Sequence, residues 1–368
     1  MKIGITIDPS VAFWANGLQQ NIVFLKHLFD AEKSIDSFYV VAQDPDKKID
    51  MKREGILLED LLRSDSLILD VLIIAGFTLN SLMYDKLKSK NPKLKIILVH
   101  FFNKFMDDIH YAINDQRTQK NPIEKPKHLS EIWILPHHEF FKEYIKCYYN
   151  FENVKVVPYL WNSFFIDQKN EELSEKGSAV SFQKKNVSKV CIFEPNISHI
   201  KNCITPIMIC EKLEQMFPDT LDSVNVFCCD HIRKGHFFKK FMKRLSIVGG
   251  RDNFCFFNNK WSTLAGLSRW GNTIVSNQIH NSLNYSHLEV LYLGMPLIHN
   301  SEELMNLGYY YPEFDIDMGA KQLKSAIINH ELVIEDYTKD CKHFIEQYDP
   351  RNSKNIIYYI NLIKSIYS

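Results

Sequence analysis

The chain has 368 residues, with 44 basic and 44 acidic side chains, so its formal net charge at neutral pH is zero. This balance argues against a protein that binds nucleic acid through bulk electrostatic attraction. Apolar residues make up 45% of the sequence, and the length exceeds what one ordinary core organises. We therefore predict two α/β domains of roughly 150–180 residues each.

The eight cysteines are scattered, and no two have the Cys-x-x-Cys spacing of a metal or redox site. Several lie in apolar runs, as Cys191 does, which predicts buried and reduced thiols. The chain begins directly with a strand-like segment, and no apolar run approaches the about eighteen residues of a membrane span. We expect a cytoplasmic protein, with peripheral contact at the inner face of a membrane as an open alternative.

In the first half of the chain, short apolar runs alternate with amphipathic stretches, which predicts a parallel sheet covered by helices. Strands are expected at 1–7, 37–42, 69–74, 94–99, 131–135 and 154–157. Helices are expected from residue 18 and at 84–90 and 140–149.

Polar and aromatic side chains gather directly after the first predicted strand. Trp14, Asn16 and Gln20 lie there together with Gly17, and apolar residues at helical spacing follow from Leu18. Asn16 either caps this helix or, with the N–H groups at the helix start, binds a phosphate or an acceptor. The segment lacks the Gly-x-Gly-x-x-Gly pattern, which argues against a nicotinamide dinucleotide site.

Histidines follow two other predicted strands, with His100 after 94–99 and His137 after 131–135. The carboxyl ends of parallel strands meet at one edge of a sheet, where open α/β sheets bind ligands. A histidine there either bonds a substrate hydroxyl or acts as a base, and the alternative is a structural role in the core.

Residues 166–188 are rich in Glu, Lys, Ser and Gln, which is typical of an interdomain linker. We therefore predict a first domain over 1–165, a linker over 166–188 and a second domain over 189–349. In the second domain, strands are expected at 189–193, 224–228, 254–257 and 273–275, and again from 297. Helices are expected up to 213 and at 237–245, 320–329 and 337–347, and a final amphipathic helix at 355–367.

The most informative stretch is 272–301, which reads as strand, polar loop, compact helix and second strand. Gly294 is placed to end the helix, because only glycine takes the left-handed conformation without steric cost. Pro296 then blocks any continuation of the helix. The polar loop 276–284 follows the carboxyl end of a buried strand, which is where open α/β sheets bind ligands.

The segment from Asn281 to Pro296 resembles the donor-binding segment of the GT-B glycosyltransferases. Retaining members carry a glutamate, seven residues, a second glutamate, and a helix that ends in Gly-x-Pro. Glu289 matches the second glutamate, which the resemblance assigns to the ribose of a nucleotide sugar, with Asn284 and Tyr285 nearby. Asn281 stands where the first glutamate lies close to the transferred sugar, so the chain departs from the pattern at that position.

Nearly the full length of the chain resembles an uncharacterised bacterial family related to these transferases. The resemblance implies two Rossmann-like domains facing a cleft, with the C-terminal helix, 350–368, packing back on the first domain. It implies a retaining hexosyltransferase that moves a sugar from a nucleotide diphosphate sugar, such as a UDP-sugar, to a hydroxyl of a glycan or lipid-linked acceptor. It also places His100 near the transferred sugar. A sugar-nucleotide epimerase of the same architecture and a catalytically silent binding protein are the alternatives.

The loop after the strand at 189–193 resembles the diphosphate-binding element of the same enzymes. Lys201, where this loop leads into a helix, would stabilise the negative charge that develops on the leaving diphosphate. Asn196 lies in the same loop, and Arg251 is a second candidate cation. The alternative for each cation is a solvated surface position.

No metal site is expected, because adjacent Cys228 and Cys229 lack the usual ligand spacing and the resemblance implies no bound metal. The nucleotide sugar is then a substrate, and no cofactor is required. The basic run at 233–244 is either a solvated helix face or a contact for an anionic membrane or acceptor.

Overall fold

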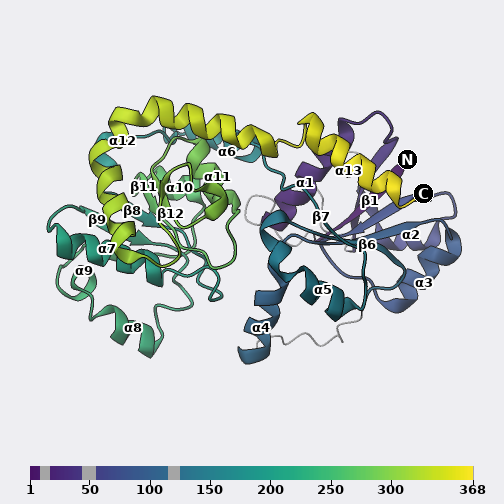
Figure 1. Ribbon diagram of the computed structural model, residues 1–368, viewed down its shortest axis with the longest axis horizontal. Coiled ribbons are helices and arrows are strands. Elements are labelled where there is room, and N and C mark those ends of the chain that lie inside the picture. Colours follow the sequence, from purple (N-terminus) through teal and green to yellow (C-terminus); the bar gives the residue numbers. More distant parts are fainter. Residues whose placement is uncertain (9–16, 44–54, 115–124, 368) are drawn as a thin grey trace. The chain divides into compact units, whose positions relative to one another are not determined.

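The computed structural model describes residues 1–8, 17–43, 55–114 and 125–367. The chain divides into two compact units, one made of residues 1–162 with 347–368 and the other of residues 163–346. Each unit is built on one parallel sheet with interleaved helices (Figure 1), which confirms the predicted α/β class.

The first unit holds a seven-stranded parallel sheet in the order β3-β2-β1-β4-β5-β6-β7. Its strands are β1 (Lys2–Ile7), β2 (Ser37–Ala42), β3 (Gly55–Leu57), β4 (Val71–Ile74), β5 (Lys95–His100), β6 (Leu129–Ile134) and β7 (Val154–Val156). Its helices are α1 (Gly17–Asp30), α2 (Leu58–Arg63), α3 (Ser81–Lys90), α4 (Lys104–Asn114), η2 (Pro136–Phe141), α5 (Lys142–Tyr149) and α13 (Ser353–Ser365). The chain reverses direction along the sheet between β1 and β4, which creates a topological switch point there.

Helix α13 belongs to the first unit, although it is the last helix of the chain. Tyr359 is buried, its ring lies 5.4 Å from that of Trp133, and its hydroxyl donates to the Pro158 carbonyl at 2.8 Å. Tyr358 donates to the Val156 carbonyl at 2.8 Å. Both hydroxyls therefore satisfy backbone acceptors at the end of β7 while the rings add apolar contact area.

The second unit holds a six-stranded parallel sheet in the order β10-β9-β8-β11-β12-β13, with its switch point between β8 and β11. Its strands are β8 (Lys189–Ile192), β9 (Ser223–Val226), β10 (Cys255–Phe257), β11 (Thr273–Val275), β12 (Leu297–His299) and β13 (Tyr309–Tyr310). Its helices are α6 (Phe164–Glu175), η3 (Lys184–Asn186), α7 (Ile204–Met216), α8 (His236–Met242), α9 (Ser246–Gly249), α10 (Thr263–Leu267), α11 (Tyr285–Tyr292), η4 (Glu302–Leu304) and α12 (Ile316–Ile345).

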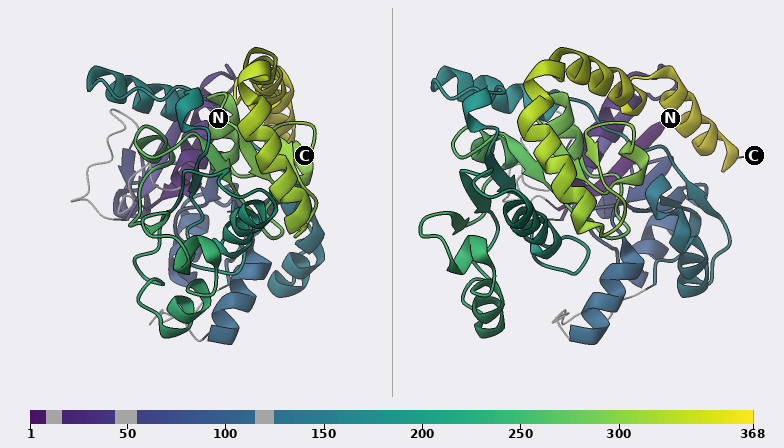
Figure 2. Two further views of the ribbon diagram at one scale, coloured as in Figure 1. Left: turned by 90° about the vertical axis from the view of Figure 1, so that its left-hand side faces the viewer. Right: turned by 60° about the vertical axis from the view of Figure 1, so that its left-hand side comes forward.

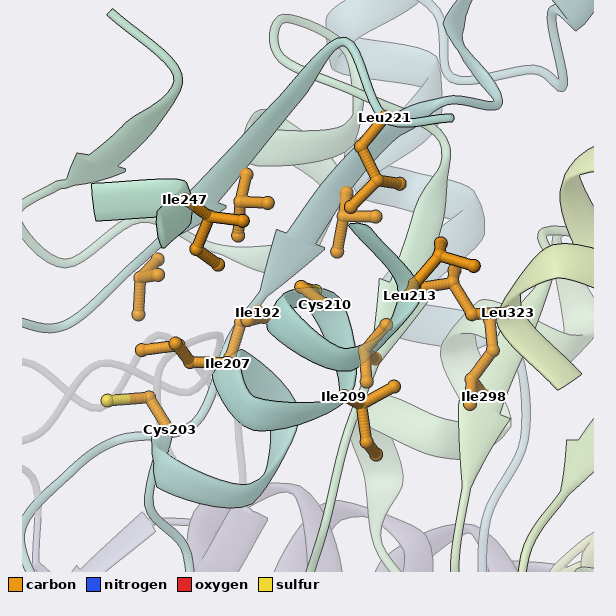
Figure 3. Close-up of a cluster of buried hydrophobic side chains, with 14 of the residues drawn as sticks. Ile192, Cys203, Ile207, Ile209, Cys210, Leu213, Leu221, Ile247, Ile298 and Leu323 are labelled. Atoms are coloured by element: carbon orange, nitrogen blue, oxygen red, sulfur yellow. The ribbon is translucent and has the colours of Figure 1, made fainter. Parts of the chain in front are cut away.

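The core of this second sheet is packed mainly by α7 and α12. Ile207, Cys210 and Leu213 project from α7 into a buried cluster that also contains Ile298 of β12 and Leu323 of α12 (Figure 3). Cysteine serves here as a small apolar side chain, and all eight cysteines of the protein are free thiols.

Two segments differ from the sequence-based expectations. Residues 166–175 of the expected linker belong to helix α6, which lies in the second unit and buries Phe165 and Ile166. Its polar composition reflects the solvated face of a surface helix. The two helices expected at 320–329 and 337–347 are one continuous helix, α12, because residues 330–336 contain no glycine or proline to interrupt it.

Gly294 ends α11 with a φ of +66°, as its position in the sequence indicated. A Cβ atom added there would collide with the Thr338 hydroxyl on α12. Glycine is therefore required both for the left-handed turn and for the close approach of α12.

Gly294→Ala is expected to lower the free energy of unfolding by about 2–5 kcal/mol, since it combines a left-handed alanine with overpacking. Gly177→Ala is the matched control, because Gly177 has a φ of +68° but open space around it. Its loss should be limited to about 1–2 kcal/mol. Urea denaturation of both variants tests this, and equal losses would show that the contact with Thr338 does not matter.

Candidate functional site

The loops that follow β8 and β11 are joined by backbone pairing at the switch point of the second sheet. The Ile279 N–H donates to the Ile200 carbonyl at 2.9 Å, and Lys201 forms an antiparallel bridge with Gln278. The Asn196 N–H donates to the Lys201 carbonyl at 3.1 Å, which closes the first loop on itself. Lys201 and the polar loop after β11 are thus held together at the edge where open α/β sheets bind ligands.

Glu194, two residues past β8, bonds to several residues of the loop after β11. Its carboxyl group is buried and accepts a hydrogen bond from the Ser276 hydroxyl at the end of β11. His287 of α11 lies 2.8 Å from the same hydroxyl through Nε2, and its buried Nδ1 has no hydrogen-bond partner in the described ranges. The Gln278 side chain and the Asn277 backbone also bond to Glu194.

The protonation states of this group follow from its burial. Burial raises the pKa of Glu194 to about 7, although the bond from Ser276 and the charge of Lys201 act in the opposite direction. Burial, with the neighbouring His299 and Lys201, holds the pKa of His287 well below its usual value. When Ser276 donates to an ionised Glu194 it can only accept from His287, so a neutral His287 then carries its proton on Nε2.

Asn281, at the position of the expected first glutamate, is buried and contacts Gln278. Its Nδ2 donates to Gln278 Oε1 at 2.5 Å, and the Gln278 N–H donates to Asn300 Oδ1 at 2.9 Å. Asn281 is therefore linked to Glu194 through one glutamine side chain.

Glu289 lies beyond the first turn of α11, where the helix dipole has little influence. No residue in the described part of the chain bonds to its carboxylate, and burial raises the pKa of Glu289 to about 7. Asn284 caps the same helix by accepting from the Ser286 N–H at 3.3 Å, and Tyr285 is buried beside it. A partly buried carboxylate without a protein partner is better suited to a ligand than to helix stabilisation.

Strained backbone gathers at this edge. Asn196, Cys228, His280 and Glu313 have φ angles of 57°, 56°, 49° and 46°, and they follow β8, β9, β11 and β13. Left-handed residues other than glycine cost free energy and cluster at functional sites. The Asn196 side chain bonds to the Glu194 and Phe227 carbonyls and to the Cys203 N–H, so it positions these loops.

Arg251 does not join the other donor-site candidates. It lies before β10, at the amino edge of the sheet, pairs with Glu214 at 2.7 Å and Asp219 at 3.5 Å, and covers the Phe254 ring at 4.0 Å. Its positive charge is balanced by these two carboxylates, and its guanidinium group packs on the Phe254 ring. This corrects the expectation that Arg251 contacts the diphosphate. The sequence indicated a cation after two glycines. It did not indicate the acidic partners of Arg251, because they lie more than thirty residues away along the chain.

In the first unit, Gly17 opens α1, Gln20 is buried in the same helix, and His137 is buried in η2 after β6. His100 ends β5 with its ring 5.6 Å from that of Tyr149, and its buried Nε2 has no hydrogen-bond partner in the described ranges. Trp14 and Asn16 lie outside the described residues.

Burial and the nearby Lys104 lower the pKa of His100 to about 3. A histidine that remains neutral at any physiological pH is a poor general base, because its conjugate acid is too strong. His100 is therefore suited to hydrogen bonding rather than to proton abstraction.

Within the described residues, no group of three or more His, Cys, Asp or Glu side chains is arranged to hold a metal ion. Asp315 and Asp317 have the Asp-x-Asp spacing, but Asp315 caps α12 and Asp317 pairs with Lys212 at 3.0 Å. The described helices include none that is both long and apolar enough to cross a bilayer.

Sequence reasoning missed the group formed by Glu194, Ser276 and His287. Glu194 follows a buried strand directly, and that position was the available signal. Its partners lie 82 and 93 residues further along the chain, and only the adjacency of β8 and β11 brings them together.

Several solved glycosyltransferases are similar to this chain. One from Rickettsia africae ESF-5 matches with a TM-score of 0.60 and 11% identity, over 99% of this chain and 98% of that one. WaaG, a glycosyltransferase involved in lipopolysaccharide biosynthesis, matches with a TM-score of 0.56 and 12% identity, over 100% and 99%. S. aureus TarM, solved in complex with UDP, matches with a TM-score of 0.53 and 14% identity, over 83% of this chain and 58% of that one.

These similarities define the fold as that of GT-B glycosyltransferases. The chain belongs to the family described as "Protein of unknown function (DUF2827)", whose model matches residues 3–363. A comparison with curated proteins finds no match.

The raised pKa of Glu194 has a consequence for stability. Its value of about 7 lies above the 4.5 of an unperturbed glutamate, so the folded state holds its proton more tightly than the unfolded state does. Stability should therefore fall as the pH rises from about 4.5 through about 7, by as much as about 3 kcal/mol.

Glu194→Gln removes this titration, so the difference in unfolding free energy between wild type and variant should change over the same pH range. Chemical denaturation of both proteins at intervals from pH 5 to pH 8 measures it. Parallel pH profiles would show that Glu194 does not titrate with a raised pKa.

Proposed function

We propose that this protein is a glycosyltransferase that moves a sugar from a nucleotide diphosphate sugar to a hydroxyl of a glycan or lipid-linked acceptor. The observation that carries the proposal is Glu289, a partly buried carboxylate without a described protein partner. It lies on the helix that the paired loops place at the switch point of the second sheet. The GT-B fold supports the same function, since similar structures are glycosyltransferases and one was solved with UDP.

Each donor-site residue has a chemical role in this proposal. Glu289 accepts hydrogen bonds from the ribose hydroxyls, which one carboxylate can do with both oxygens. Lys201 stabilises the charge on the departing diphosphate, with a stronger effect in the transition state than in the ground state. Asn281 lies nearest the transferred sugar, and Asn284 and Tyr285 line the approach to it.

Glu194 acts as a positioning residue. Its carboxyl group ties Ser276 and Gln278 to the loop that carries Lys201, and through Gln278 it reaches Asn281. A charge held in place by surrounding bonds loses little free energy to reorganisation during the reaction.

We propose that residues of the first unit bind the acceptor. Gly17 offers backbone N–H groups at the start of α1, and Gln20, His100 and His137 offer side-chain polar groups. Trp14 and Asn16 belong to the same proposal. Because His100 is a poor base, the proposal favours retention of the anomeric configuration over an inverting reaction that needs a base at this position.

Three further elements of the proposal rest on the resemblance to GT-B enzymes. The donor nucleotide is UDP, the reaction needs no bound metal, and the protein acts in the cytoplasm. Each is open to a direct assay of nucleotide preference, chelator sensitivity or cellular location.

A catalytically silent nucleotide-sugar-binding protein is the second candidate, and Asn281 is the observation that favours it. An amide replaces the expected carboxylate, and it is engaged with Gln278. Incubation with nucleotide sugars and a broad set of glycan and lipid-linked acceptors separates the two functions. Transfer or slow hydrolysis of the donor supports the enzyme, whereas binding without turnover across the set supports the silent protein.

The diphosphate contact gives a test that does not depend on the acceptor. Lys201→Ala removes a charge-assisted contact of about 1.5–3 kcal/mol. Affinity for the nucleoside diphosphate should then fall by about 10–100-fold, while affinity for the nucleoside should barely change. Thermal-shift titrations with both ligands measure these affinities.

Arg251→Ala is the matched control, since it also removes one cation from the second unit. It should destabilise the fold, because it leaves Glu214 without its ion-pair partner, but it should leave nucleotide affinity unchanged. If Lys201→Ala weakens nucleoside and nucleoside diphosphate equally, or if Arg251→Ala reproduces its effect, Lys201 does not bind the diphosphate.

A further inference from the structure

The balanced charge of the whole chain hides one strongly basic segment. Residues 231–251 contain no Asp or Glu, and their basic side chains are Arg233, Lys234, Lys239, Lys240, Lys243, Arg244 and Arg251. Five of these, Lys234, Lys239, Lys240, Lys243 and Arg244, are exposed, and none of the five forms an ion pair with a residue that the structure describes. Their mutual repulsion is therefore not relieved within the described part of the protein.

The same segment carries an exposed aromatic ring. Phe237 of α8 is 80% exposed, and its ring stacks on Phe241 at 6.1 Å. On the inner side of the helix, Phe238 packs against Phe257 at 5.3 Å and Met242 is buried, so α8 is anchored to the second unit. We call Phe237 and the five exposed cations the α8 surface.

Helix α8 lies at one end of the second unit, away from α11 (Figures 1 and 2). None of its side chains is among the main groups that influence the pKa of Glu194 or Glu289 at the β8 and β11 edge of the described structure. A role in donor binding does not account for its composition.

We propose that the α8 surface docks on an anionic lipid bilayer. The five cations attract negatively charged headgroups, and Phe237 enters the boundary between headgroups and acyl chains. A soluble polyanion would satisfy the cations equally well but would leave Phe237 in water. The combination of unpaired cations with a highly exposed phenylalanine therefore selects a membrane. This inference is independent of the proposed glycosyl transfer.

Flotation of the full-length protein with lipid vesicles tests the proposal. Binding is expected to vesicles of equal parts phosphatidylglycerol and phosphatidylcholine, not to phosphatidylcholine alone, and should weaken as salt screens the charges. The double substitution Lys239→Glu and Lys240→Glu should reduce binding by about 10–100-fold or more. Phe237→Ser should reduce it several-fold while leaving the dependence on salt unchanged.

Helix α3 of the first unit and the turn that follows it supply matched controls. Leu82 is also 80% exposed, and Lys86 and Lys93 are exposed cations. Leu82→Ser, and Lys86→Glu combined with Lys93→Glu, should bind vesicles as wild type does. Circular dichroism should show all variants folded.

Three results would overturn the proposal. They are no wild-type binding to the anionic vesicles at low salt, equal losses in the α3 controls, and binding that ignores Phe237→Ser but is abolished by soluble heparin. The last would make a soluble polyanion the partner. Because the assay contains no nucleotide, its failure leaves donor binding by Lys201 and Glu289 untouched.

Discussion

The candidate site depends on the pairing of two loops at one switch point. Strands β8 and β11 are parallel neighbours in the sheet but lie about eighty residues apart in sequence. After β8 the chain continues toward β9 on one side, and after β11 it continues toward β12 on the other side. The bridge between Lys201 and Gln278 and the burial of Glu194 against Ser276 hold the two loops together. A buried carboxyl group is costly unless its hydrogen bonds are satisfied, so losing one partner would loosen the whole edge.

Much of the fold could be predicted from local sequence. Gly294 and Pro296 marked the end of α11 because their backbone restrictions are intrinsic, and the apolar runs marked the parallel strands. The site was only partly accessible in this way. Glu289 and Lys201 stood out in local motifs, whereas the contacts of Glu194 with Ser276 and of Arg251 with Glu214 arise from tertiary structure alone. The helical nature of 164–175 was also missed, since polar composition alone does not separate a linker from a solvated helix.

The distribution of charge matters more here than its sum. Net neutrality argues against bulk attraction to nucleic acid, yet it conceals a segment of 21 residues without a single acid. The edge formed by the loops after β8 and β11 and the α8 surface lie in the same unit, but their charged groups are in different environments. Around Glu194, the charged groups are buried and hydrogen-bonded, which favours precise placement. The cations of the α8 surface are exposed and form no ion pair with the residues that the structure describes, which favours attraction to a large charged surface.

The central claim is that α11 holds the ribose of a donor nucleotide through Glu289. Isothermal titration of wild type and Glu289→Gln with UDP or GDP and with the 2′-deoxyribose form of the same nucleotide tests it most directly. Wild type should prefer the ribose form, and Glu289→Gln should bind that form about tenfold more weakly, a loss of about 1.4 kcal/mol, and show no preference between the two. A variant that still prefers ribose as strongly as wild type would contradict the account.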